Sequence, residues 1–156
     1  MTKSHNYAVT IEWTGARQGP TISYTSYSRE FTLKCDGKVD IIGSSDKAFR
    51  GDSTLYNPEE LLVSAISSCH LLWYLHLCAV NNIHIISYID QATGVMQTDE
   101  NGGGRFSEVI LSPTIIVTKN SDIASAIRLH DNAHEKCFIA NSINFPIKLT
   151  PTVRHE

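Results

Sequence analysis

The sequence predicts an α+β domain, and two observations carry that prediction. One long apolar segment, residues 56–82, has the composition of a buried helix, and strand-like segments lie on both sides of it. A second, shorter helical pattern follows the later strands, so strands and helices come in separate runs rather than in regular alternation. The chain has 156 residues with no internal repeat and no linker, and we expect a single domain over residues 1–156.

The central helix has a clear start signal. Asn57 can cap the helix, and Pro58 suits its first position. Glu59 and Glu60 place negative charge at the positive end of the helix dipole. Residues 61–80 then lack Asp, Glu, Lys, Arg, Gly and Pro and are apolar on every side, which predicts a buried helix about 35 Å long. A membrane span is the rival interpretation, but the histidines and serines in the segment disfavour it.

Strands are expected before this helix. Residues 7–13 alternate apolar and polar side chains, which predicts a strand with one buried face. Further strands are expected over residues 21–26 and 31–35, and Asp36 followed by Gly37 predicts a hairpin turn into residues 39–42. A polar, irregular loop is then expected to lead into the helix.

The second half of the sequence is expected to form a hairpin, a helix and a final strand. Residues 83–95 and 106–118 are rich in branched side chains, and the glycine-rich residues 99–104 form the expected tip between them. The remaining predicted elements are a second helix capped by Ser121 or Asp122 and ending near Cys137, a helical turn over residues 141–144, and a final edge strand over residues 147–153.

Composition and charge exclude several kinds of partner. Lys and Arg number 13 against 16 Asp and Glu, so the net charge is −3, and no basic run is present to attract nucleic acid or an anionic membrane. The first residues lack the apolar segment of a secretory signal, and we therefore expect a cytoplasmic protein. In that compartment the four cysteines are expected to be thiols rather than a disulfide framework.

The residues around two of these cysteines resemble the OsmC/Ohr family of thiol-dependent peroxidases. The family's Asn-Pro-Glu helix start occurs at residues 57–61, Cys69 follows ten residues after Glu59, and Cys137 lies near the end of the later helix. A Thr-Gly-x-Arg turn at residues 14–17 matches the family's arginine position. The resemblance covers roughly residues 12–146. It implies an OsmC-like fold with antiparallel sheets, a long buried central helix and an intertwined homodimer.

The resemblance also implies a two-cysteine reaction with hydroperoxides that needs no cofactor and no metal. Cys69 would attack the peroxide as a thiolate and become a sulfenic acid, which Cys137 would trap as a disulfide. A dithiol reductant would then restore both thiols. Burial in an apolar helix opposes formation of a thiolate, so a cation must reach Cys69. The resemblance assigns that role to Arg17, held in place by Glu59.

Helix geometry adds an expectation about the assembly. Glu59 and Cys69 are ten residues apart, which is about 15 Å along a helix axis. One carboxylate cannot easily hold an arginine that also contacts a thiol so far along the same helix. We therefore expect Glu59 and Arg17 of one subunit to serve Cys69 of the other. Arg29 and Arg50 are competing candidates for the cation.

His70 is the main departure from the family pattern, in which an apolar or aromatic residue usually follows the first cysteine. Three interpretations are open for it: a core histidine with a hydrogen-bond partner, a base for the thiol, or part of a polar substrate pocket. Apolar walls from Leu72, Trp73 and Phe138 would favour a substrate with a hydrocarbon tail. Phe138 stands where family members commonly have proline, which indicates a divergent subgroup.

Other cysteine and histidine residues have simpler interpretations. Cys35 and Cys78 are expected to be unreactive, because free cysteines are among the most buried residues. His130, His134 and Cys137 have a spacing that can bind a metal on a helix. Such spacing arises easily by chance, and we expect no metal site.

The sequence as a whole predicts a cytoplasmic homodimer that reduces hydroperoxides, organic ones above all, in defence against oxidative stress. Two alternatives stay open. One is a redox-sensing or metal-binding module that uses the same cysteines without turnover. The other is a small-ligand-binding protein of this fold that lacks peroxidase activity.

Overall fold

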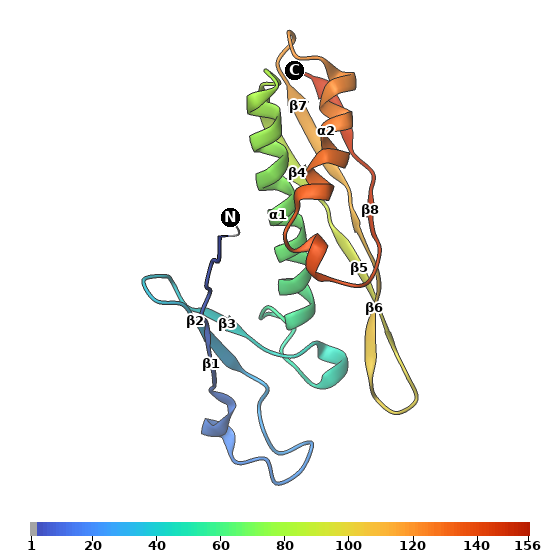
Figure 1. The fold of residues 1–156 in the computed structure, drawn as a ribbon. Helices are drawn as coiled ribbons and strands as arrows, with labels where there is room; N and C mark the ends of the chain where they lie inside the picture. The colour runs from blue at the N-terminus through green and yellow to red at the C-terminus, as the bar shows by residue number, and fades with distance from the viewer. Residues whose placement is uncertain (1–2) are drawn as a thin grey trace. The chain divides into compact units, whose positions relative to one another are not determined.

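The structure is a computed structural model that describes residues 3–156. The chain forms two compact units, the first ending at Leu61 and the second comprising Leu62–Glu156 (Figure 1). The long helix α1 (Pro58–Val80) begins in the first unit and runs into the second. The expectation of a single domain stays a prediction.

The first unit is built on a three-stranded antiparallel sheet. Its strands are β1 (Thr10–Trp13), β2 (Phe31–Lys34) and β3 (Ile41–Gly43), in the order β1-β2-β3. The predicted hairpin between β2 and β3 is confirmed, and Gly37 has a φ of 70°, a backbone conformation that glycine adopts without strain. Two short 3-10 helices, η1 (Gly15–Gln18) and η2 (Lys47–Phe49), lie in the connections.

Two strand predictions in this unit are wrong. Residues 21–26 form turns and bends, because Ser26 Oγ accepts a hydrogen bond from the Ser23 amide and donates to the Pro20 carbonyl. Such local side-chain bonds compete with strand pairing. The first strand is shorter than predicted, and all four residues of β1 are exposed rather than buried on one face.

The predicted start of α1 is confirmed in detail. The Glu60 amide donates to Asn57 Oδ1 over 2.8 Å, and the Asn57 amide donates to Glu60 Oε2 over 3.1 Å. This reciprocal pair is a capping box, which satisfies two backbone donors at the helix end.

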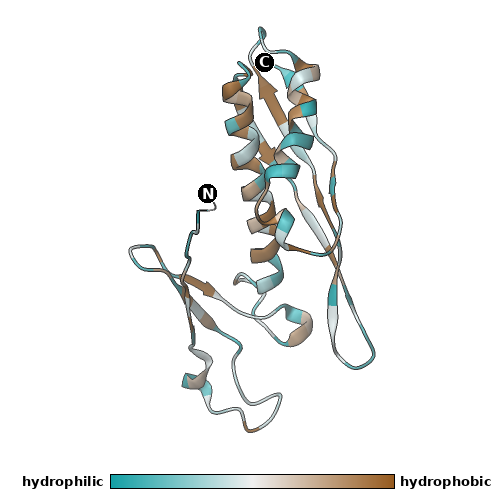
Figure 2. Ribbon diagram, viewed as in Figure 1, coloured by the Kyte–Doolittle hydropathy of each residue, from teal (hydrophilic) through white to brown (hydrophobic). Residues whose placement is uncertain are grey.

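The predicted burial of α1 on every side is wrong. Its buried residues form one stripe spaced four residues apart: Ile66, His70, Tyr74 and Cys78. Leu72 and Val80 are 67% and 62% exposed, although apolar residues run along the whole helix (Figure 2). The apolar composition of a helix does not show how many neighbouring elements are available to cover it.

Length and composition alone would allow α1 to cross a membrane, since an 18-residue window reaches a mean hydropathy of 1.5. Within residues 3–156 it is the one helix with that property. Its buried stripe, however, belongs to a core shared with strands and a second helix. Only 22% of the 18-residue window is buried.

The second unit contains the predicted long hairpin, divided into four strands. They are β4 (Ile85–Asp90), β5 (Thr93–Thr98), β6 (Gly104–Leu111) and β7 (Pro113–Val117), with β4 antiparallel to β7 and β5 antiparallel to β6. The division lies where Asp90 Oδ1 accepts a hydrogen bond from the Ser112 amide over 2.7 Å. One continuous hairpin thus supplies strands to two sheets.

The last strands add two parallel pairs to the expected antiparallel sheets. The predicted final strand is divided into β8 (Ile147–Leu149) and β9 (Thr152–His155), and they pair in parallel with β6 and β7. The chain reaches them through the helix α2 (Ile123–Lys136) and the 3-10 helix η3 (Ala140–Ser142), a crossover long enough for parallel pairing. Both strands lie at sheet edges, as predicted.

Helix α2 is confirmed with its predicted cap, since Asp122 accepts a hydrogen bond from the Ser125 amide over 2.6 Å. Helices α1 and α2 share one core cluster with strand β7 and the segment that follows α1. A second cluster joins Ile66 of α1 to Val109 and Leu111 of β6. Burial of each large aliphatic side chain in these clusters stabilises the fold by about 1.5–3 kcal/mol.

A pair of histidines lies inside the contact between α1 and α2. His70 and His130 are each 1% exposed, and His70 Nε2 is 2.9 Å from His130 Nδ1. The Tyr74 ring stacks on His130 with 3.8 Å between ring centroids. Burial lowers the pKa of His70 to about 4 and that of His130 to about 3, with charge from His134 and from the pair itself as smaller causes. Both imidazoles are therefore neutral at pH 7.

Because of this histidine pair, we expect the free energy of unfolding to decrease in mild acid. In the unfolded chain the two histidines bind protons near pH 6.5, whereas in the folded protein they bind them only near pH 4 and pH 3. Protons therefore favour the unfolded state, so the free energy of unfolding is greatest above pH 6.5 and decreases as the pH falls below that value. Each histidine is expected to contribute a slope of up to about 1.4 kcal/mol per pH unit. Urea unfolding between pH 7 and pH 4.5 measures that slope.

The matched comparison uses His130→Gln, which keeps a hydrogen-bonding side chain but removes one titrating group. Its unfolding free energy should depend less on pH than that of the wild type. The control is His84→Gln, because His84 is exposed, and this variant should keep the wild-type slope. Equal slopes in all three proteins would contradict the prediction.

Candidate functional site

The structure brings Cys69 and Cys137 together. Cys69 is half-buried in the middle of α1, and Cys137, 1% exposed, immediately follows α2. Both are free thiols, and Cys69 lies close enough to Cys137 to affect its pKa. The packing of α1 against α2 thus brings the two thiols near each other.

The end of α2 fixes the position of Cys137. The Cys137 amide still donates to the His134 carbonyl over 3.2 Å, but its backbone is already extended, with φ −67° and ψ 112°. The chain then turns back, so the Asn141 amide donates to the Cys137 carbonyl over 3.0 Å. The Ala140 amide donates to Cys137 Sγ over 3.4 Å. Helix end and turn together hold the sulfur toward α1.

The two thiols are in different environments. Burial, with the neighbouring Cys69 thiol as a smaller cause, raises the pKa of Cys137 to about 11. Backbone donors at Ala140 and Ile139 oppose this shift but do not cancel it. The Cys137 thiol therefore keeps its proton at neutral pH.

Aromatic side chains lie beside this pair of thiols. The Trp73 and Phe138 rings meet edge to face with 5.5 Å between centroids, and Phe138 is 68% exposed. Lys136 Nζ lies 6.0 Å from the Trp73 ring centroid. Leu72 is also exposed. The surface near the thiols is accordingly apolar, with one cation at its edge.

His70 has the geometry of a core histidine with a hydrogen-bond partner, the first of its three interpretations. Its partner His130 was not foreseen from the sequence, because 60 residues separate the two and no local pattern links them. His70 Nδ1 and His130 Nε2 are buried without a hydrogen-bond partner within residues 3–156.

Arg17 and Glu59 both belong to the first unit, whereas Cys69 and Cys137 belong to the second. Arg17 is exposed in η1, next to Glu12, whose pKa it lowers slightly after the larger effect of Lys34. Glu59 lies in the first turn of α1, and its Oε2 is buried with no hydrogen-bond partner in the described chain. Arg17 and Glu59 form no ion pair there, so their predicted cooperation stays a prediction.

The remaining cysteines and the two histidines of the possible metal site lie outside the pair formed by Cys69 and Cys137. Cys78 is buried in the α1 stripe, and Cys35 is half-buried just beyond β2. Burial raises the pKa of Cys78. Within residues 3–156 no group of three His, Cys, Asp or Glu side chains could hold a metal ion. His130 Nδ1 is engaged with His70.

Solved structures of similar fold come from several bacteria. An OsmC-like protein of unknown function from Vibrio cholerae is 27% identical, with a TM-score of 0.85, and the match covers 95% of this chain and 99% of that one. An organic hydroperoxide resistance protein from Elizabethkingia anophelis is 22% identical, with a TM-score of 0.68 and coverage of 99% and 100%. The organic hydroperoxide resistance protein OhrB of Bacillus subtilis is 21% identical, with a TM-score of 0.63 and coverage of 96% and 98%.

The likeness to the two hydroperoxide resistance proteins shows the fold alone, since fewer than a quarter of residues are identical. A comparison with proteins of curated function finds no match. The family model for OsmC-like proteins matches residues 51–152, which is more than half of the chain and includes both cysteines of the site. Together with the fold, this match shows that the chain belongs to the OsmC-like protein family.

Proposed function

We propose that this protein reduces hydroperoxides through Cys69 and Cys137, and that it serves in oxidative stress defence in the cytoplasm. The observation that carries the proposal is the proximity of two reduced thiols that the sequence separates by 68 positions. This proximity supports a disulfide between them as the oxidised state.

The proposed reaction balances as two half-reactions. The Cys69 thiolate attacks the terminal oxygen of the hydroperoxide, the O–O bond breaks, and the alkoxide leaves and takes a proton as the alcohol. Cys69 is then a sulfenic acid. Cys137 attacks its sulfur, the S–O bond breaks, and water leaves as the disulfide forms. A dithiol reductant returns two electrons and two protons and restores both thiols.

The environments of the two sulfur atoms support this order of attack. Cys69 is half-buried and can meet a substrate, whereas Cys137 is 1% exposed. Burial and the neighbouring Cys69 thiol keep the pKa of Cys137 high, so Cys137 keeps its proton at neutral pH. Cys69 is accordingly the peroxidatic thiol and Cys137 the resolving thiol.

The surroundings of the thiols support an organic peroxide as the substrate. Trp73, Phe138 and the exposed Leu72 offer apolar surface to a hydrocarbon tail. Hydrogen peroxide has no group that would gain from that contact. The alcohol product of an organic peroxide keeps the same tail and leaves by the same surface.

Stopped-flow oxidation of the reduced protein tests the two-cysteine reaction. Wild type should lose two thiols per chain rapidly with cumene hydroperoxide and more slowly with hydrogen peroxide. Cys69→Ser should lower the rate by about two orders of magnitude or more, because it removes the nucleophile. Cys137→Ser should react but stop at a sulfenic acid, which dimedone labelling and mass spectrometry detect.

The control for thiol counting is Cys35→Ser, since Cys35 lies in the other unit and is expected to be unreactive. It should oxidise at the wild-type rate and lose the same two thiols. Oxidation of wild type no faster than that of free cysteine would exclude peroxidase activity. Redox sensing or ligand binding by the same fold would then become the better hypothesis.

The cation that activates Cys69 is proposed to be Arg17, held by Glu59 of the same subunit and directed to Cys69 of the partner subunit. Support comes from the buried Glu59 oxygen, which lacks a hydrogen-bond partner among residues 3–156. A buried carboxylate oxygen in that state needs a donor, and arginine supplies two in parallel.

Arg17→Gln tests this assignment. It should slow oxidation of Cys69 by about 10- to 100-fold at pH 7 and move the pH profile of the rate to higher pH, since a thiolate loses its neighbouring cation. Arg105→Gln, an exposed position in the second unit, is the matched control. A wild-type rate and pH profile in Arg17→Gln would contradict the role.

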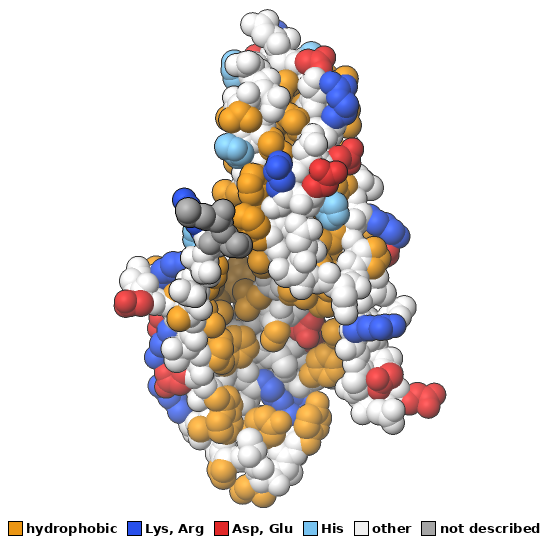
Figure 3. Space-filling view, in the orientation of Figure 1, with side chains coloured by type: hydrophobic (Ala, Val, Ile, Leu, Met, Phe, Trp, Pro, Cys, Tyr) orange, Lys and Arg blue, Asp and Glu red, His pale blue; other side chains and the backbone are white. Residues whose placement is uncertain are grey.

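A homodimer is supported by the apolar surface that each unit leaves uncovered (Figure 3). No apolar side chain in residues 3–61 is buried, and a three-stranded sheet without a buried face is not stable by itself. The exposed large apolar residues of the first unit include Ile11, Trp13, Ile42 and Tyr56. Those of α1 include Leu72, Leu75 and Val80.

Size-exclusion chromatography with light scattering tests this assembly. The mass expected is twice that of the chain, and it should persist at micromolar concentration because large apolar interfaces are of the obligate kind. Ile11→Lys together with Ile42→Lys should shift the protein toward a monomer and lower peroxidase activity with it. A wild-type monomer with full activity would exclude the shared site.

A further inference from the structure

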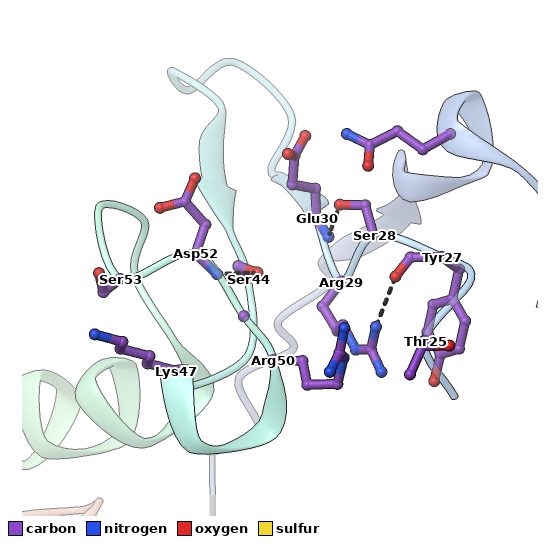
Figure 4. Close-up of a pocket in the computed structure, with 12 residues that line it drawn as sticks. Thr25, Tyr27, Ser28, Arg29, Glu30, Ser44, Lys47, Arg50, Asp52 and Ser53 are labelled. Carbon is purple, nitrogen blue, oxygen red and sulfur yellow. Dashed lines mark hydrogen bonds between the residues drawn. The ribbon is translucent and has the colours of Figure 1, made fainter. Parts of the chain in front are cut away.

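The first unit contains a polar pocket that the thiol chemistry does not use. Its volume is about 530 Å³, and all of its lining residues lie between Gln18 and Ser53, within that unit (Figure 4). Three cationic side chains line it, Arg29, Lys47 and Arg50, against the two carboxylates of Glu30 and Asp52. The lining is thus net positive in a chain whose net charge is −3.

Arg29 is held in place before any ligand arrives. Its guanidinium lies between two aromatic rings, 4.6 Å from the Tyr24 centroid and 4.1 Å from the Tyr27 centroid. It donates to the Tyr27 carbonyl over 2.6 Å and to the Tyr24 carbonyl as well. A guanidinium has five N–H donors, so three are left for another group. Its rotamer entropy is already lost in the folded protein, which favours binding.

Arg50 is positioned by a tightly bonded loop. Its backbone is left-handed, with φ 66°, and its amide donates to the Lys47 carbonyl over 3.0 Å. The Gly51 amide donates to the Asp46 carbonyl over 3.0 Å, and a Cβ on Gly51 would collide with the Ser45 carbonyl. The Asp52 amide donates to Ser44 Oγ over 3.1 Å. Arg29 and Arg50 extend into the pocket from two different segments (Figure 4).

None of the three cations is neutralised within the described part of the chain. The ion pairs there join Lys34 to Glu12 and Lys148 to Glu108, both outside the pocket. Asp52 is engaged in its own turn, where Oδ1 accepts from the Thr54 amide over 2.8 Å and from the Thr54 hydroxyl over 2.7 Å. These hydrogen bonds hold the pKa of Asp52 below its usual value. Asp52 therefore stays ionised at neutral pH, but within residues 3–156 it forms no ion pair with Arg29 or Arg50.

Hydroxyl groups supply further donors around the cations. Thr25, Tyr27, Ser28, Ser44 and Ser53 line the same pocket. Guanidinium groups combined with hydroxyls match the oxygen atoms of a carboxylate or a phosphate, to which arginine binds in a bidentate manner. The volume is in the range of small-molecule sites and exceeds what an inorganic ion needs.

We propose that this pocket binds a small organic oxyanion, with Arg29 and Arg50 as the residues that bind its carboxylate or phosphate group. Lys47 adds positive charge at the pocket wall, and the Tyr27 ring offers a flat surface to the organic part of the ligand. The binding proposal can be tested separately from the reaction at Cys69, because neither Cys69 nor Cys137 lines the pocket.

Calorimetric titration of the full chain with phenyl phosphate and with benzoate tests the proposal. The two probes share a ring and differ in the anionic group, so the tighter one identifies the head group. We expect saturable binding of at least one probe, unchanged in Cys69→Ser. Arg50→Asn should weaken it by about 10- to 100-fold, the usual effect of losing charge-assisted hydrogen bonds. Asparagine tolerates the left-handed backbone at this position, so the variant is expected to fold.

Arg154→Asn is the control, because Arg154 is an exposed arginine of β9, outside the pocket. It should bind both probes as the wild type does. Amide chemical shifts provide a second readout, with the largest changes expected at Arg50 and Gly51. No saturable binding of either probe, or equal affinities in wild type and Arg50→Asn, would overturn the proposal. Loss of peroxidase activity with retained binding would affect only the proposed thiol chemistry.

Discussion

The packing of α1 against α2 is the contact on which the candidate thiol site depends. Four side chains of α1, spaced four residues apart, supply the buried stripe, and α2 contributes small residues such as Ala126 and Ala133 that let the two helices approach. Cys69 lies next to this stripe, and Cys137 lies at the point where α2 ends. Packing, rather than a local motif, therefore determines the distance between the two sulfur atoms.

The same helix contact contains polar groups whose burial is energetically unfavourable. His70 and His130 share one hydrogen bond, yet each keeps a second ring nitrogen buried without a partner within residues 3–156. A buried unsatisfied polar group typically costs about 1–3 kcal/mol. An apolar pair of the same volume would avoid that cost. Stability alone does not account for these two histidines, and their place beside the two cysteines links the polar core to the site.

The two units differ in the kind of chemistry that they support. The second unit contains both core clusters and both thiols of the site, with apolar aromatic surface around them. The first unit buries no apolar side chain of residues 3–61 and instead holds unpaired arginines in a polar pocket. The two thiols of the proposed reaction and the lining of the proposed anion site thus belong to different units. The exposed apolar sheet of the first unit is where further packing would stabilise it.

The sequence by itself determined the elements whose signals are local. The capping residues around Asn57, the hairpin at Gly37 and the cap at Asp122 are predicted and found, because a few neighbouring residues decide each of them. Cys69 and Cys137 were identified through a family resemblance, but their proximity comes only from helix packing. The His70–His130 pair, the exposed sides of α1 and the parallel pairing of β8 and β9 were decided by tertiary structure. Each depends on groups far apart in the chain, and no local pattern records which distant neighbour covers a side chain.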